Sequence, residues 1–192
     1  MIENSSISNP QKLHPHKFIM WIAIASICMM FAGLTSAYIV KKSQDNVEKV
    51  MLPNLFWWST LVIILSSLTI QIAVKNIKAK EMQRYRLMLG ITAFLGILFA
   101  VMQWYGFKIL RTNGILFTGK NSNPGASFLL IIIGLHALHV LGGVIALIVF
   151  NIKIYFSKIR NYSAVPVEVV ATYWHFVDIL WVYLLLFLMF MR

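Results

Sequence analysis

Five long apolar stretches constrain the fold of this 192-residue chain more than any other feature. They run approximately over residues 18–40, 55–74, 87–107, 127–150 and 171–191. Each approaches the roughly 20 apolar residues that cross a bilayer as a helix. Backbone exposed to lipid must satisfy its own hydrogen bonds, so spanning helices follow. We therefore predict an all-α, polytopic membrane protein. We expect one five-helix membrane domain over residues 1–192, with a polar segment at residues 1–17.

The composition agrees with a membrane protein. Hydrophobic residues make up 59% of the chain and charged residues 12%. The charged share is about half of that in a soluble domain. The net charge of +11 sits between the apolar stretches. There it sets orientation and meets anionic lipid, so we do not predict nucleic-acid binding.

The lysines and arginines outside the apolar stretches predict the orientation. Ten of them lie in the N-terminal segment and in the second and fourth loops, and seven lie in the first and third loops and at the C-terminus. Cytoplasmic segments carry the excess of these residues. We therefore expect the N-terminus in the cytoplasm and the C-terminus on the opposite, outer side.

Two classes of residue within the stretches are suited to contacts between helices. Small residues four apart allow helices to approach closely in lipid, and they occur as Gly33 with Ala37, Ala32 with Ser36, and Gly142 with Ala146. Neutral polar side chains can form hydrogen bonds between helices. In the first three stretches they are Ser26, Thr35, Ser66, Ser67, Gln71 and Gln103.

The fourth stretch contains His136 and His139, which share a helix face because they are three residues apart. One interpretation is a metal or haem site, with His175 of the fifth stretch as a further ligand. The other is hydrogen bonding to neighbouring helices or to a lipid headgroup. A closed zinc site needs four ligands, and the single cysteine, Cys28, is distant in sequence. We therefore favour hydrogen bonding and predict no metal site, while a bis-histidine haem remains the alternative.

The fifth stretch places His175 and Asp178 on one face, with Glu168 seven residues before His175. Ionisable side chains at membrane depth are costly and mark a functional or structural site. These three residues could form a proton relay or a polar clamp that fixes helix packing. No other acidic residue occurs within an apolar stretch, so we favour the clamp. Glu168 follows Pro166 and fits the first turn of a helix, where the helix dipole favours a carboxylate.

Lys153 lies at the end of the fourth stretch, 14 residues after His139 and near the same face. Its ammonium group can reach the headgroup layer while its methylene groups stay in apolar surroundings. It is therefore a candidate ligand for a lipid phosphate, or an ordinary flanking lysine.

The order of these residues resembles a known family. The pattern Glu168-x4-Tyr173-Trp174-His175-Phe176-Val177-Asp178-x2-Trp181 resembles the last-helix signature of subunit III of haem–copper oxidases. The segment Gly134-Leu135-His136-Ala137-Leu138-His139-Val140 is similar to the preceding helix of that family. Leu52-Pro53-Asn54 and Gln103 also fit. The chain looks like the short, five-helix bacterial form, in the bacterial inner membrane.

The resemblance implies an accessory subunit without a catalytic centre or metal of its own. Haem and copper would lie in partner subunits of a complex that reduces oxygen and translocates protons. The chain would pack on subunit I, with subunits II and IV as further partners, bind phospholipid and support proton uptake. The residues expected to fix the last helix are Glu168, Tyr173, Trp174, His175, Asp178 and Trp181, whereas His136, His139 and Lys153 would contact helices or lipid.

The sequence departs from the family pattern at three positions. Ser26 stands where a glutamate is usual in the first stretch, Gly106 where the third often has another, and Lys153 where an arginine is common. The departures indicate a divergent branch, so a subunit of a nitric-oxide-reductase-type complex is one alternative. A bis-histidine haem protein for electron transfer is another. A small transporter would show an internal repeat or broken helices, and the sequence shows neither.

Overall fold

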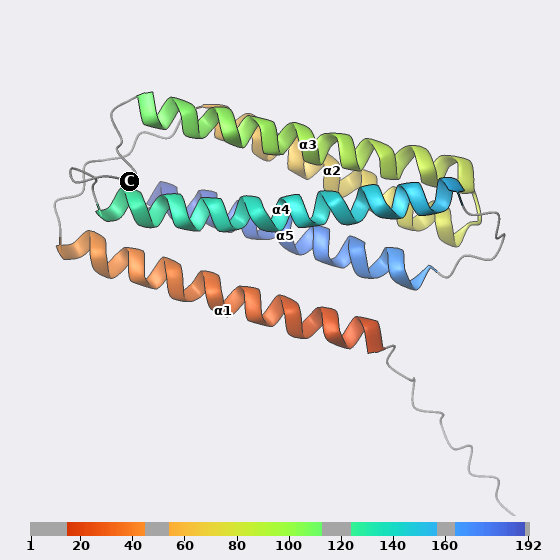
Figure 1. Ribbon diagram of the computed structural model, residues 1–192, viewed down its shortest axis with the longest axis horizontal. Helices are drawn as coiled ribbons and strands as arrows, with labels where there is room; N and C mark the ends of the chain where they lie inside the picture. The colour runs from red at the N-terminus through yellow and green to blue at the C-terminus, as the bar shows by residue number, and fades with distance from the viewer. Residues whose placement is uncertain (1–14, 45–53, 113–123, 157–163, 191–192) are drawn as a thin grey trace, which may run out of the picture.

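The computed structural model describes residues 15–44, 54–112, 124–156 and 164–190, and five α-helices account for nearly all of them (Figure 1). The helices are α1 (Pro15–Gln44), α2 (Leu55–Lys78), α3 (Met82–Thr112), α4 (Pro124–Phe156) and α5 (Val165–Phe190). All five are long and apolar enough to cross a membrane. The prediction of an all-helical, multi-pass membrane protein is therefore confirmed for the described residues.

The helices extend beyond the apolar stretches that predicted them. Helix α1 begins at Pro15 and α4 at Pro124, and Pro166 is the second residue of α5. Proline is tolerated in a first turn because the N–H that it lacks has no partner within the helix. At the other end of α1, Lys41 and Lys42 lie in the last turn, where a positive charge interacts favourably with the helix dipole. Polar residues therefore continue these helices past their apolar segments.

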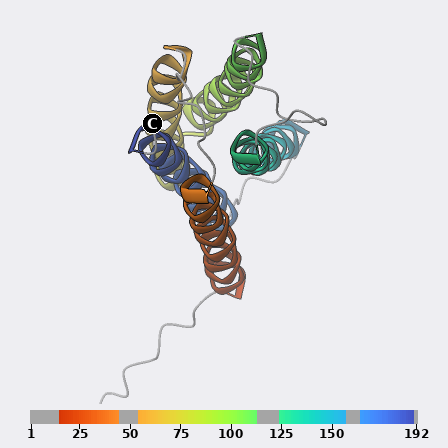
Figure 2. The ribbon, with the colours of Figure 1, turned by 90° about the vertical axis from the view of Figure 1, so that its left-hand side faces the viewer.

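Helices α2, α3, α4 and α5 form a ring, and α1 packs on its outside. Within the ring, α2 contacts α3 and α5, and α4 contacts the same two helices. Helix α1 contacts only α4 and α5 among the described helices, and it lies at the lower edge of the end-on view in Figure 2. Burial follows this arrangement. Within the apolar 18-residue segment of each helix, 17% is buried in α1 and 44% is buried in α5.

A tight turn joins α2 to α3. The N–H of Glu81 donates to the carbonyl of Asn76 at 2.9 Å, and the N–H of Lys80 donates to the carbonyl of Ile77 at 3.1 Å. This pair of bonds is the Schellman arrangement, which needs a left-handed residue after the helix. Lys80 takes that conformation with φ of 62°. The turn brings α3 straight back along α2.

The Trp174 ring of α5 packs directly against glycine residues of two neighbouring helices. A Cβ atom on Gly96 of α3 would lie 2.7 Å from Cη2 of Trp174, and one on Gly143 of α4 would lie 2.9 Å from its Cε3 and Cζ3. Only glycine fits at these two positions, because ordinary carbon contacts are about 3.5–4.0 Å. The indole ring is 1% exposed and fills the space between the helices.

The small-residue pairs predicted as contact points lie elsewhere. Gly33 and Gly142 are exposed on the outside of the bundle, and a Cβ atom on either would meet nothing within 4 Å. Ala32, Ser36 and Ala37 are exposed as well. Gly33 and Gly142 are therefore not points of close helix contact among the described residues. Spacing alone does not tell which face of a helix points inward, and here the aromatic ring on α5 determines where glycine is needed.

Candidate functional site

The last helix is joined to α2 by a row of hydrogen bonds. The indole Nε1–H of Trp174 donates to Ser66 Oγ at 3.1 Å, and that of Trp181 donates to Thr60 Oγ1 at 3.0 Å. Trp174 and Trp181 are seven residues apart, which is about two helical turns, so both point the same way. The two tryptophans therefore fix the position of α5 along α2.

His175 makes two further bonds to α2. Its Nε2 lies 3.2 Å from Gln71 Oε1, and its Nδ1 lies 2.6 Å from Ser67 Oγ. An amide oxygen only accepts hydrogen bonds, so Nε2 carries the hydrogen. In the neutral ring Nδ1 is then the acceptor and receives the hydroxyl hydrogen of Ser67. Both ring nitrogens therefore have hydrogen-bond partners on α2.

Asp178 lies one turn beyond His175 but does not bond to it. The residue is 5% exposed, and neither carboxyl oxygen has a hydrogen-bond partner among the described residues. Ser67 of α2 is the polar residue next to Asp178, but its hydroxyl group forms its hydrogen bond with His175. In the proposed polar clamp, His175 is therefore the residue that bonds to α2. Asp178 is a buried carboxyl group without a hydrogen-bond partner among the described residues.

On its other side, α5 contacts α4 through Tyr173 and the two histidines of α4. The hydroxyl of Tyr173 donates to the backbone carbonyl of His139 at 3.0 Å. The His139 ring donates from Nδ1 to the Leu135 carbonyl at 2.7 Å and packs edge-on against Phe31 of α1, with ring centroids 5.8 Å apart. His139 therefore lies where α1, α4 and α5 meet.

His136 occupies a different environment from His139. Its ring stacks on Trp181 with centroids 5.3 Å apart and meets the edge of Phe99 at 6.2 Å. The residue is fully buried, and neither ring nitrogen has a partner among the described residues. The predicted lipid-headgroup contact does not fit this position, because the ring is enclosed by aromatic side chains. Lys153, in contrast, is exposed in the last turn of α4.

Most of the neutral polar residues bond between helices as predicted. Thr35 of α1 bonds to Tyr183 of α5 at 3.2 Å, and Gln103 of α3 donates to Ser59 of α2 at 2.9 Å. Together with Ser66, Ser67 and Gln71, they confirm that prediction for five of the six residues. Ser26 is the exception, because its hydroxyl donates to the carbonyl of Ile22 in its own helix.

Glu168 ties three helices together at one end of the bundle. Its carboxylate oxygens lie 2.7 Å from Lys17 Nζ of α1 and 2.8 Å from Lys78 Nζ of α2. Glu168 itself lies in the first turn of α5, as predicted from Pro166. In the sequence, Lys17 and Lys78 indicate only the orientation of the chain. Their pairing could have been found from the sequence, since antiparallel helices bring the start of α1, the end of α2 and the start of α5 to the same side.

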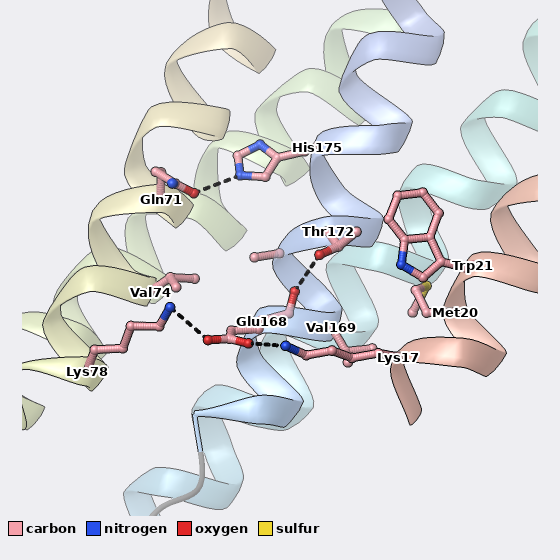
Figure 3. A pocket seen from close by; sticks show the side chains of 11 residues that line it. Lys17, Met20, Trp21, Gln71, Val74, Lys78, Glu168, Val169, Thr172 and His175 are labelled. Atoms are coloured by element: carbon pink, nitrogen blue, oxygen red, sulfur yellow. Dashed lines mark hydrogen bonds and ion pairs between the residues drawn. The ribbon is translucent and has the colours of Figure 1, made fainter. Parts of the chain in front are cut away.

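This ion cluster borders a cleft between α1, α2 and α5. The cleft has a volume of about 510 Å³ and is lined by Lys17, Trp21, Gln71, Lys78, Glu168 and His175, among others (Figure 3). Figure 3 shows Glu168 between the two lysines and His175 turned toward Gln71 farther along the cleft. The cleft thus connects a charged rim with the side chain of His175.

No group of three or more histidine, cysteine, aspartate or glutamate side chains that could hold a metal ion occurs in the part of the chain that the structure describes. Glu168, Tyr173, His175 and Tyr183 of α5 are instead used in contacts between helices. Their arrangement is that of a scaffold with one enclosed acid.

Comparisons with known proteins identify the family of this chain. Residues 14–192 match the family model described as cytochrome c oxidase subunit III. The chain belongs to the cytochrome c oxidase subunit III family. Over 178 residues it is 34% identical to a probable cytochrome c oxidase subunit 3 of Mycobacterium leprae, covering 91% of this chain and 86% of the relative.

Two further relatives broaden the comparison. Cytochrome c oxidase subunit 3 of Bacillus sp. strain PS3 is 27% identical over 174 residues, covering 88% of this chain and 83% of the relative. Cytochrome bo(3) ubiquinol oxidase subunit 3 of Buchnera aphidicola is 29% identical over 173 residues, covering 87% of each chain. This subunit III chain is thus similar to subunits named for two kinds of haem–copper oxidase.

Proposed function

We propose that this chain is an accessory subunit III of a haem–copper terminal oxidase in a bacterial inner membrane. It packs on subunit I, next to subunit II and, where present, subunit IV, and it carries no haem or copper itself. The family match over residues 14–192 is the observation that carries the proposal. Relatives named for cytochrome c oxidase and for ubiquinol oxidase both match, so the proposal concerns the subunit that they share and leaves the electron donor open.

The hydrogen bonds of α5 support a structural role. Trp174, His175 and Trp181 all bond to α2, and Tyr173 bonds to α4. Side chains used in this way are not free to bind substrate. In our proposal they hold α5 in position, and the chain sustains proton uptake and the stability of the complex while subunit I reduces oxygen to water.

The ion cluster supports an orientation. Lys17, Lys78 and Glu168 lie at one end of the bundle. Lys80 in the loop between α2 and α3 and Arg84 in the first turn of α3 lie at the same end. Basic loops face the cytoplasm. We place this end and the N-terminus in the cytoplasm and the C-terminus in the periplasm. Reporter domains fused after residue 80 and after residue 192 test this, and a periplasmic signal from residue 80 would contradict it.

Bound phospholipid is a further part of the proposal. Lys153 is exposed at the end of α4 that, by this orientation, faces the cytoplasm. A lysine in that place reaches the phosphate of a lipid headgroup. Native mass spectrometry of the complex should show less retained phospholipid after Lys153→Ala. Equal retention in the wild type and the variant would remove Lys153 from the proposal.

Co-purification in mild detergent tests the proposed function itself. A tagged chain should bring down a large, haem-containing subunit with many membrane-embedded histidines, and the isolated chain should show no haem absorption band. Asp178→Asn should weaken assembly or long-term turnover but leave a single oxygen-reduction cycle intact. Recovery of the chain with stoichiometric haem of its own would favour the electron-transfer alternative.

A further inference from the structure

Asp178 lies deep in the bundle, near the middle of α5. It is the fourteenth residue of a 26-residue helix, so about 20 Å of helix separates it from the start of α5 at a rise of 1.5 Å per residue. Only 5% of the residue is exposed. An acid at this depth in a membrane protein is a candidate functional site.

The surroundings of Asp178 offer little that stabilises a negative charge, because the nearby hydroxyl group of Ser67 is bonded to His175. Neither oxygen accepts a hydrogen bond from a described residue, and the nearby polar group on α2 is the neutral Ser67. Around this depth α1 presents Cys28, which is exposed on the outer surface, and α4 presents His136 and His139. These two rings face Trp181 and Phe31.

Lys17 and Lys78, the cations beside α5, are bonded to Glu168 at the far end of the cleft. Among the described residues Asp178 therefore has no paired cation and one neutral hydroxyl neighbour, and a carboxyl group buried in this way takes up a proton instead of remaining charged. The neutral carboxyl group is therefore the form that fits this position.

A short series of polar groups connects this carboxyl group with the cleft. Ser67 Oγ neighbours Asp178 and lies 2.6 Å from His175 Nδ1. The other ring nitrogen of His175 lies 3.2 Å from Gln71 Oε1, and both His175 and Gln71 line the cleft (Figure 3). A hydroxyl group can donate one proton while it accepts another, and an imidazole ring can accept at one nitrogen and release at the other.

We infer that Asp178 is a proton-binding site that exchanges its proton with the cleft through Ser67 and His175. On release, the carboxyl proton moves to Ser67 Oγ, the Ser67 hydroxyl proton moves to His175 Nδ1, and the Nε2 proton of His175 leaves into the cleft. Ser67 and the ring each gain one proton and lose one, so the net change is one proton lost by Asp178. The use of this site by an oxidase rests on the proposed function, whereas the site itself does not.

Isotope labelling reads the protonation state of Asp178 without changing it. Asp45 and Asp178 are the two aspartates of the sequence, so Asp45→Asn leaves Asp178 as the single site for a ¹³C-carboxyl aspartate label. The labelled full-length chain would be made by cell-free synthesis in lipid nanodiscs and examined by infrared spectroscopy at neutral pH. We expect the carbonyl band of a protonated acid. The band of a carboxylate ion would overturn the inference.

Exchange in heavy water tests the path. In the same labelled chain, Ser67→Ala should slow the deuterium shift of the Asp178 band by about tenfold or more, because one hydrogen bond of the path is lost. Ser67→Thr keeps the hydroxyl group and should restore the rate. Ser66→Ala is the matched control, because Ser66 bonds to Trp174 and lies outside the path. Equal exchange rates in Ser67→Ala and Ser66→Ala would refute the path. These readouts need no partner subunit, so they can fail or succeed independently of co-purification.

Discussion

Gly143 and Gly142 are neighbours on α4 with opposite surroundings, and substituting each by alanine tests the packing of Trp174. A Cβ atom on Gly143 would lie 2.9 Å from two atoms of the Trp174 ring and 3.3 Å from Tyr173, whereas one on Gly142 would meet nothing within 4 Å. The ring has little room to retreat. Its nitrogen bonds to Ser66, and its far edge lies against Gly96.

Two terms determine the expected stabilities. Replacing glycine by alanine inside a helix gains about 1 kcal/mol at either position. Overfilling a packed core costs about 1–3 kcal/mol, and this cost applies only at Gly143. Gly142→Ala should therefore gain up to about 1 kcal/mol. Gly143→Ala should be less stable than Gly142→Ala by about 1–3 kcal/mol, because the helix term cancels between the two variants.

Thermal unfolding in detergent, followed by tryptophan fluorescence, measures the difference. At about 2–4 °C per kcal/mol for a chain of this size, Gly143→Ala should unfold several degrees below Gly142→Ala. Combining Gly143→Ala with Trp174→Phe should recover part of the loss, because the smaller ring leaves space for the methyl group and the two effects are then not additive. Equal melting temperatures for the two alanine variants would refute the steric argument.

Three further changes test other contacts. Glu168→Gln removes both lysine pairs and should cost about 1 kcal/mol or less per pair because they are partly exposed, and the loss should shrink in high salt. Glu81→Gln serves as the control, because Glu81 forms an exposed ion pair with Arg84 at 3.0 Å. Lys80→Gly should raise the melting temperature, since it relieves a left-handed conformation that costs about 1–2 kcal/mol, and an unchanged or lower temperature would contradict this. Thr60→Ala should cost about 1–3 kcal/mol because it leaves the buried Trp181 N–H without an acceptor, whereas Thr60→Ser should restore most of the stability in the same unfolding assay.

The sequence predicted the helices well because an apolar stretch of about 20 residues is by itself a sign of a membrane-spanning helix. It also predicted that residues such as Thr35 and Gln103 would bond between helices, since an unpaired polar group inside a membrane bundle is costly. The family resemblance depended on polar and aromatic residues of the same helices, above all those of α5. Of the residues in that pattern, Trp174, His175 and Trp181 bond to α2, and Tyr173 bonds to α4.

The sequence did not predict which residues would be partners. Small-residue spacing pointed to Gly33 and Gly142, while the helices approach closely at Gly96 and Gly143, because the position of the Trp174 ring depends on three helices at once. His136 and His139 were expected to share a role, yet a rotation of about 60° between residues three apart is enough to place one against Trp181 and the other against Phe31. Such differences arise from tertiary packing and not from local pattern.

The outer position of α1 has a consequence for biosynthesis. Helix α1 is the first of the five to leave the ribosome, but the helices that it contacts, α4 and α5, are the last two to be made. Lys17 and Glu168, which join α1 to α5, are separated by 151 residues. During synthesis, α1 therefore has none of the helices that it contacts until nearly the whole chain has been translated. Its attachment completes the bundle, so an interrupted chain would expose this helix as an unassembled segment.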